Sequence, residues 1–241
     1  MKQAVKSDAI YLYGKNSIRE RLISNPRSIR QVYIQENFPD KDILKLIITN
    51  NVAFTHKDEK WLKRQKRADR LQGIIAVVEP FSYANLDEII SQKRNIIWLD
   101  GVNDPQNVGL IIRILACFGK FALGLPGKGS CEINDTVLHV ASGGENYVPV
   151  CLVENPFEAI GKMKKLGYQI AGTTVQGGKN LAQAGLKTPL CLILGSEGEG
   201  ISKESASLAD FSVTIPMAGA ALSFNVAMAC SILCYEIFRQ D

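Results

Sequence analysis

Apolar residues occur along this chain of 241 residues in short continuous runs, and segments with helical spacing separate the runs. In the first eighty residues, the runs have the length of β-strands and the intervening segments place apolar residues on one helical face. The strand-like runs are 30–35, 52–57 and 73–78, and the helix-like segments are 17–24 and 41–50. This alternation predicts a small α/β domain over residues 1–80. The polar stretch after Pro80 predicts a linker and a leading helix over residues 81–95.

Six further apolar runs follow, again alternating with helical patterns. They are residues 96–100, 121–125, 148–153, 168–174, 190–195 and 211–217. Continuous apolar runs are typical of parallel strands that are buried on both faces of a sheet. Residues 96–241 are therefore predicted to form an α/β domain with helices on both faces of a parallel sheet. In such sheets ligands bind outside the carboxyl ends of the strands, so the loops that follow the strands are the candidate sites.

The charge is distributed unevenly between these two parts. Residues 1–95 hold 18 Lys and Arg against 11 Asp and Glu, whereas residues 96–241 hold 10 against 13. A basic first part favours a partner that is a polyanion. The segment 56–70 carries seven of these basic residues with Trp61 among them. It predicts either a solvated helix face or a contact with nucleic-acid phosphates.

Cysteine, histidine and hydropathy patterns narrow the class of protein. The six cysteines are Cys117, Cys131, Cys151, Cys191, Cys230 and Cys234. No CxxC pair occurs, so we predict reduced core residues rather than disulfides or metal ligands. With only two histidines, His56 and His139, no metal site is expected. No apolar run reaches the length of a membrane span and the first residues lack a secretory pattern, so a cytoplasmic protein without membrane attachment is expected.

The loop after the first strand of the second part carries polar residues inside an apolar segment. It reads DPQNVGLIIR, residues 104–113, and places Asn107, Gly109 and Arg113 at fixed steps. A packed helix does not accommodate a buried guanidinium without a partner. These residues therefore face either water or a substrate.

Two more loops follow later strands. GSEGEG at 195–200 matches neither common phosphate-binding glycine motif, and its glutamates would repel a phosphate. It predicts either a plain turn or a site for a neutral or cationic ligand. IPMAGAALSFNVA at 215–227 places Ser223 and Asn225 before a helix that is apolar nearly all round, which predicts burial or a subunit interface. These two residues predict helix capping, and because no GxSxG motif surrounds Ser223, a hydrolytic serine is disfavoured.

Taken in order, the three loops resemble the motifs of the SpoU (TrmH) family of RNA 2′-O-ribose methyltransferases, within the SPOUT superfamily. Segment 141–150 is similar to the piece that follows the first motif, and segments 13–22 and 71–89 look like the family's small N-terminal RNA-binding domain. The resemblance implies a parallel sheet with a deep trefoil knot in its C-terminal part, a homodimer that pairs through it, and an N-terminal α/β domain like ribosomal protein L30.

The resemblance also assigns residues to the reaction. The catalytic residues that it implies are Asn107, Arg113, Glu197, Ser223 and Asn225. The residues that it implies for S-adenosylmethionine are Thr173, Thr174, Leu194, Gly195, Ser196, Gly198, Ile215, Met217, Ser223 and Phe224. We interpret Arg113 as a clamp on the substrate phosphate that also stabilises a developing alkoxide, because a guanidinium is a poor base. Glu197 is expected to hold loops rather than accept the proton.

The implied function is S-adenosylmethionine-dependent methylation of a ribose in RNA, with a guanosine of 23S ribosomal RNA as the expected substrate. A tRNA substrate and a non-catalytic RNA-binding or ribosome-assembly protein on the same fold are the alternatives. The sequence departs from the common family pattern at Leu71, Leu110 and Phe224, where His, Ala and Leu are usual.

Overall fold

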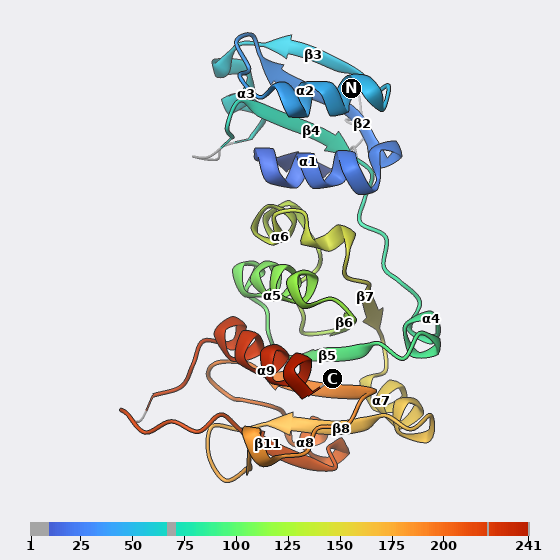
Figure 1. Cartoon of the computed structure of the whole chain (residues 1–241), viewed down its shortest axis with the longest axis vertical. Helices are drawn as coiled ribbons and strands as arrows, with labels where there is room; N and C mark the ends of the chain where they lie inside the picture. Colours follow the sequence, from blue (N-terminus) through green and yellow to red (C-terminus); the bar gives the residue numbers. More distant parts are fainter. Residues whose placement is uncertain (1–9, 67–70, 221, 241) are drawn as a thin grey trace, which may run out of the picture. The chain divides into compact units, whose positions relative to one another are not determined.

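The structure is a computed structural model that describes residues 10–66, 71–220 and 222–240. The chain divides into two compact units (Figure 1). The first unit combines Met1–Ser82 with Ile133–Asn146, and the second combines Tyr83–Glu132 with Tyr147–Asp241. The chain therefore passes between the units three times. The predicted division at residues 81–95 stays a prediction, and the units differ from it by the segment 133–146.

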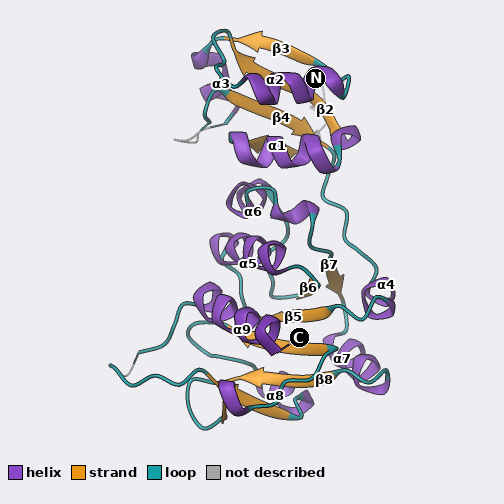
Figure 2. Cartoon of the chain, viewed as in Figure 1, coloured by secondary structure: helices purple, strands orange, loops and turns teal. Residues whose placement is uncertain are grey.

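The first unit contains a four-stranded sheet with the strand order β1-β4-β2-β3 (Figure 2). Its strands are β1 (Ile10–Tyr13), β2 (Ile29–Gln35), β3 (Phe54–Lys57) and β4 (Ile74–Val78). Strand β4 is antiparallel to both β1 and β2, and β3 pairs with β2 in parallel. The three predicted strands are present, although β3 begins at Phe54 rather than at residue 52, and the sequence pattern missed β1.

Helices cover this sheet and bury apolar residues at helical spacing. They are α1 (Lys15–Ser24), α2 (Lys41–Thr49), α3 (Glu59–Gln65) and α6 (Asp135–Ala141), with short 3₁₀ turns at Pro26–Ser28 and Gly144–Asn146. Helix α2 begins where the Asp40 side chain accepts a hydrogen bond from the Ile43 backbone N–H. Ile43 and Ile47 then face the core, as the sequence predicted for this helix. Residues 67–70, the end of the predicted basic segment, lie outside the described residues.

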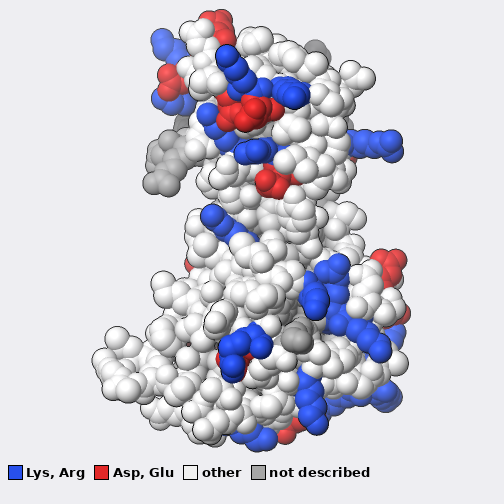
Figure 3. Space-filling view, viewed as in Figure 1, with Lys and Arg blue, Asp and Glu red and all other residues white. Residues whose placement is uncertain are grey.

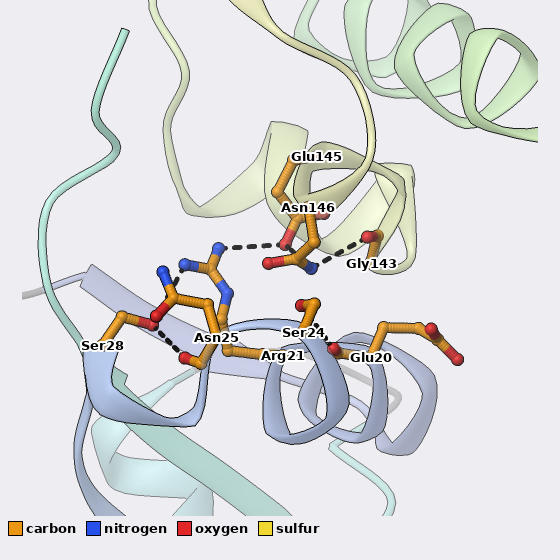
Figure 4. Close-up of polar contacts among 8 residues, drawn as sticks. All are labelled: Glu20, Arg21, Ser24, Asn25, Ser28, Gly143, Glu145 and Asn146. Carbon is orange, nitrogen blue, oxygen red and sulfur yellow. Dashed lines mark hydrogen bonds and ion pairs between the residues drawn. The ribbon is translucent and has the colours of Figure 1, made fainter. Parts of the chain in front are cut away.

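The segment Ile133–Asn146 packs onto the first unit through rings and charges. The His139 ring stacks on Tyr13 with ring centroids 4.0 Å apart, and His139 Nδ1 lies 3.1 Å from the Tyr13 carbonyl oxygen. Arg21 Nη2 donates a hydrogen bond to Glu145 Oε1 over 3.1 Å (Figure 4). Both Arg21 and Glu145 are buried. The 3₁₀ turn of this segment is thereby held against helix α1.

The second unit contains a seven-stranded parallel sheet in the order β7-β6-β5-β10-β8-β11-β9. Its strands are β5 (Asn95–Asp100), β6 (Phe121–Pro126), β7 (Val150–Val153), β8 (Gln169–Thr173), β9 (Lys179–Asn180), β10 (Leu190–Gly195) and β11 (Phe211–Thr214). All six predicted strands occur. Strand β11 ends at Thr214, so Ile215 and Met217 lie in the following loop, and the two-residue strand β9 was not predicted.

Helices lie on both faces of this sheet, as predicted. They are α4 (Leu86–Ser91), α5 (Pro105–Phe118), α7 (Pro156–Lys165), α8 (Lys203–Leu208) and α9 (Val226–Gln240). Helices α4, α7 and α8 pack on the face that presents Ile96 and Trp98, and α5 packs against α9. Ring centroids of Phe118 and Phe238 lie 5.9 Å apart between these two helices.

Helix α9 is not buried all round. Met228, Tyr235 and Phe238 are more than half exposed, so the predicted subunit interface on this helix stays a prediction. Four cysteines are buried as predicted, but Cys117 is exposed and Cys131 is half-buried. Across the described residues, the helices all fall short of the length and apolar character needed to span a membrane.

Candidate functional site

A cavity of about 390 Å³ lies at the carboxyl ends of strands β8, β10 and β11. This volume is within the range of small-molecule sites. The structure brings to it every residue that the sequence assigned to cofactor binding. These are Thr173, Thr174, Leu194, Gly195, Ser196, Gly198, Ile215, Met217, Ser223 and Phe224. The edge of a parallel sheet where strands end is the place expected for a ligand.

The loop after β10 folds into a closed turn beside this cavity. The Ser196 N–H donates to the Gly200 carbonyl over 3.1 Å, and the Gly200 N–H donates back over 3.0 Å. A Cβ at Gly195 would lie only 2.0 Å from the Gly200 carbonyl carbon, so the backbone itself approaches too closely for a side chain. The loop is therefore both a tight turn and a wall of the cavity. The close approach requires glycine at position 195, and the φ of +71° favours it at position 200.

The lining combines apolar side chains with two carboxylates. Of its described residues, only Glu197 and Glu199 carry a charge. Thr173 Oγ1 donates to the Ile193 carbonyl over 3.0 Å, so that hydroxyl is already engaged by the sheet. The cavity is therefore suited to a ligand with an apolar, flat part and a positive charge.

Three side chains from the three motif segments meet beside the cavity. Asn107 Nδ2 donates to Glu197 Oε1 over 3.1 Å, and Asn225 Nδ2 donates to the same oxygen over 2.5 Å. Asn225 Nδ2 also lies 2.8 Å from Asn107 Oδ1. Asn107 stands in the first turn of α5, and Asn225 directly precedes α9. The network thus joins the three predicted motifs in space.

Asn225 has a second role in this network. Its Oδ1 accepts hydrogen bonds from the backbone N–H groups of Ala227 and Met228, at 2.9 and 3.3 Å. It therefore caps helix α9, as the sequence predicted, while its amide nitrogen points to Glu197. Ser223 is exposed and lines the cavity, and both histidines belong to the first unit.

Arg113 stands apart from the other predicted catalytic residues. It is exposed on α5, it does not line the cavity, and its guanidinium makes no hydrogen bond or ion pair with another described residue. An exposed, unengaged guanidinium is available to a bound molecule or to a second protein chain. The described residues contain no group of three or more His, Cys, Asp or Glu that could hold a metal ion.

Comparison with known families decides the relationship. Residues 94–235 match the model of the SpoU rRNA Methylase family, and residues 11–84 match the model for RNA 2′-O ribose methyltransferase substrate binding. The chain belongs to the SpoU family. The predicted α/β fold with its parallel sheet is confirmed, and the trefoil knot stays a prediction.

Named relatives of this SpoU-family chain share its full length. It is 34% identical over 236 residues to 23S rRNA (guanosine-2′-O-)-methyltransferase RlmB of Ralstonia nicotianae, covering 95% of both chains. It is 28% identical over 245 residues, 96% of both chains, to a protein of Staphylococcus haemolyticus that is named for the TrmH family of tRNA/rRNA methyltransferases.

Solved structures of the family agree with the fold. A TrmH-family protein from Porphyromonas gingivalis is 26% identical with a TM-score of 0.81, covering 98% of this chain and 92% of its own. AviRb from Streptomyces viridochromogenes, solved with AdoMet, is 22% identical with a TM-score of 0.82 over 98% and 91%. At that identity the second likeness supports the fold alone.

The sequence missed several residues of the cavity. They are Val175, Glu199, Gly200, Ile201, Val213, Val226, Ala229 and Leu233. Val226, Ala229 and Leu233 lie at helical spacing on α9, and that periodicity was the available signal. Of the departures from the family pattern, Phe224 lines the cavity, Leu110 is exposed on α5, and Leu71 is buried in the first unit.

Proposed function

We propose that this chain transfers a methyl group from S-adenosylmethionine to the 2′-hydroxyl of a ribose in RNA, and that the substrate is a guanosine of 23S ribosomal RNA. The observation that carries the proposal is the hydrogen-bonded set of Asn107, Glu197 and Asn225 beside one cavity. The family and the RlmB relative support the reaction and the substrate.

The cavity fits S-adenosylmethionine in chemistry as well as in size. Leu194, Ile215 and Phe224 offer apolar surface for an adenine ring, and the carboxylates of Glu197 and Glu199 suit a positively charged ligand. The closed turn of residues 195–200 brings backbone amides and carbonyls close to the ligand. When bound, the cofactor supplies an electrophilic methyl group on a sulfonium.

The side chains of the chain supply alignment and charge. Asn107 and Asn225 fix Glu197, which holds the three loops together and so keeps the cavity in one shape. Arg113 binds the substrate phosphate and stabilises the negative charge that develops on the 2′-oxygen. The 2′-proton leaves to phosphate or water, because the pKa of a guanidinium, above about 12, makes it a weak base. Alignment of the attacking oxygen with the methyl group contributes to the rate.

The first unit supplies the contact with RNA in this proposal. Helix α3 carries exposed Lys60, Lys63 and Arg64, and Lys57 Nζ lies 5.2 Å from the centre of the Trp61 ring. Cations bind phosphates and aromatic rings stack on unpaired bases. A 2′-hydroxyl acceptor makes RNA the substrate rather than DNA.

A homodimer is part of the proposal. The exposed apolar residues of α9 offer a surface for a second copy, and the position of Arg113 away from the cavity suits an arginine that serves the site of the partner chain. The cytoplasmic location expected from the sequence stays a prediction.

The test is methyl transfer from radiolabelled S-adenosylmethionine to total RNA from a strain that lacks this protein, with Arg113→Ala as the control. Label in one 23S fragment that is lost in the control supports the proposal. Label in tRNA keeps the enzyme and changes its substrate. If RNA binds but calorimetry detects no binding of S-adenosylmethionine, the protein is a non-catalytic RNA-binding protein.

A further inference from the structure

The amino-terminal edge of the seven-stranded sheet gathers basic residues. Because the strands are parallel, the residues that precede each strand lie at one edge, opposite the cavity. Four neighbouring strands, β6, β5, β10 and β8, are each preceded by basic residues. These are Lys120 before β6, Lys93 and Arg94 before β5, Lys187 before β10, and Lys164 and Lys165 before β8. We call these six residues the basic edge.

Hydrogen bonds join the strand starts that carry the basic edge, so these starts lie side by side. The Asn95 N–H donates to the Lys120 carbonyl over 3.0 Å, which joins the starts of β5 and β6. Asn95 Oδ1 accepts from the Leu190 N–H over 3.0 Å, which joins β5 to β10. The Lys187 N–H donates to Gln169 Oε1 over 2.8 Å, which joins β10 to β8. With neighbouring strands about 4.8 Å apart, the row spans roughly 15 Å.

Most of the positive charge on this edge is not neutralised within the fold. Lys164 pairs with Asp210 at 2.9 Å, and Arg94 hydrogen-bonds to Gln92 and to a backbone carbonyl. The side chains of Lys93, Lys120 and Lys187 are exposed and make no hydrogen bond or ion pair to the described residues. Figure 3 shows Lys and Arg side chains gathered on one side of the second unit, beside α4 and α7.

Carboxylates are more frequent at the opposite edge. The strand ends and loops there carry Asp100, Asp104, Glu154, Glu197 and Glu199 together with Lys128, whereas Asp210 precedes β11 at the edge that carries the lysines. Helix C-termini attract cations, which accounts for Lys164 and Lys165 in the last turn of α7. That explanation does not apply to Lys187, which lies in the loop between the 3₁₀ turn Leu181–Gln183 and β10.

Two of these lysines adopt a backbone conformation that is energetically unfavourable for a residue with a side chain. Lys93 has φ of 52° and Lys120 has φ of 54°, in the left-handed region that glycine adopts most readily. Each stands just after a helix, where glycine is the common residue. Backbone hydrogen bonds hold both residues, but their side chains make no hydrogen bond or ion pair to the described residues that would account for lysine rather than glycine at these positions.

We propose that the basic edge binds the phosphate backbone of the RNA substrate outside the nucleotide that is methylated. The inference rests on the proposed RNA substrate and adds a contact surface in the second unit to the one expected of the first. A row of cations at strand spacing meets a polyanion whose charges repeat every few ångströms, and binding releases counterions from the RNA. Such contacts position the RNA and carry no sequence preference.

The test uses the triple variant Lys93→Gln/Lys120→Gln/Lys187→Gln of the full chain. The control is Lys41→Gln/Lys45→Gln/Lys203→Gln, which changes the net charge equally at exposed positions of α2 and α8, outside both this edge and helix α3, the surface proposed for RNA in the first unit. Affinity for a structured 23S RNA fragment is measured at several salt concentrations without cofactor. We expect about tenfold weaker binding at 0.15 M salt than in the control, and a slope of log affinity against log salt that is lower by about 2 to 3.

Two further measurements separate the possible outcomes. Lys93→Gly/Lys120→Gly relaxes the backbone, so it should weaken RNA binding while its thermal midpoint stays equal or rises. In methylation assays the KM for RNA should rise by about the factor by which RNA affinity falls. If the test triple and the control triple bind RNA with equal affinity and equal salt slope, the inference is overturned. It is also overturned if the test triple binds RNA like the control but no longer binds polyglutamate, because the edge would then bind an acidic protein. Because RNA binding is read without methyl transfer, absence of any methylation by the wild type would contradict the proposed function and leave this test intact.

Discussion

Glu145 in the first unit and Glu197 in the second are both carboxylates with several polar neighbours, but their surroundings differ. Glu145 is 6% exposed and faces the buried guanidinium of Arg21. Glu197 is exposed and is held by the neutral amides of Asn107 and Asn225. The contact between Arg21 and Glu145 removes both side chains from water. The amides around Glu197 leave its carboxylate in contact with water and restrain only the orientation of the side chain.

The Arg21–Glu145 pair therefore bears on the stability of the fold, and the network around Glu197 bears on the position of the loops at the site. Arg21 Nε and Glu145 Oε2 have no hydrogen-bond partner among the described residues, so the buried pair is not fully satisfied (Figure 4). Burial raises the pKa of Glu145 above its ordinary value, although Arg21 acts to lower it. Such a pair is costly to break from one side even where its net contribution is small. The amide network around Glu197 involves little burial, so its loss should alter the site more than the fold.

The largest effect is expected from breaking the buried pair. Arg21→Met leaves Glu145 buried without its cation and should lower the free energy of unfolding by about 3–5 kcal/mol. Urea unfolding at pH 7.5 measures this change. The double variant Arg21→Met/Glu145→Leu removes both charges and should recover most of the loss. If Arg21→Met is as stable as the wild type, then Glu145 without its cation imposes no measurable cost on the fold.

The next effect is expected at the amide network. Asn225→Asp keeps the oxygen that caps α9 but replaces the donor to Glu197 with a second carboxylate. Misplacement of the loops should lower the methyl-transfer rate about 100-fold while the unfolding free energy changes by less than about 1 kcal/mol. Asn225→Ala is the matched control, because it loses the cap as well and should also be less stable. Equal activity in Asn225→Asp and the wild type would exclude a positioning role.

The same contrast explains what the sequence could predict. Asn107, Glu197 and Asn225 belong to segments that follow buried strands, and the strand pattern places such segments at one edge of a parallel sheet. The individual residues of the site and of the cavity were named from the resemblance to the SpoU motifs, which the strand pattern alone does not supply.

The first unit shows where that reasoning ends. Arg21 and Glu145 are 124 residues apart, and neither lies in a recognisable motif. The segment 133–146 follows a strand of the second unit, so its packing against α1 depends on tertiary contacts that no periodicity records. Strand β9 has only two residues, which is too short for alternation to be distinguished from a loop. The pattern also missed the four-residue strand β1, although other strands of that length in the chain were predicted.

Arg113 sharpens the comparison, since it is the exposed counterpart of the buried Arg21. Arg113→Lys keeps the charge but loses the planar pair of donors that fits a phosphate. We expect a rate of methyl transfer about tenfold lower than the wild type, with unfolding in urea unchanged. If Arg113→Lys instead transfers methyl groups at close to the wild-type rate, charge alone is sufficient and a fork-shaped clamp is the wrong description.

The smallest effect is a dependence of the Arg21→Met defect on pH. The folded-state pKa of Glu145 lies above the ordinary value of 4.5, so the fold holds a proton that the unfolded chain has already lost. Stability therefore falls as the pH rises from that ordinary value through the raised pKa. Removing Arg21, whose charge lowers the pKa of Glu145, widens this window. The difference in unfolding free energy between variant and wild type should be smaller at pH 4.5 than at pH 7.5, by about 1.4 kcal/mol for each pKa unit by which the variant raises the pKa of Glu145 further.

The control for this dependence is Arg21→Met/Glu145→Gln, in which no carboxyl titrates at position 145. The unfolding free energy of this double variant should not change with pH through position 145, because glutamine does not titrate. A defect of Arg21→Met that is equal at both pH values would show that Glu145 keeps its charge in the fold without Arg21. Water rather than the guanidinium would then be the group that stabilises this carboxylate, and the contrast with the solvated Glu197 would be one of degree.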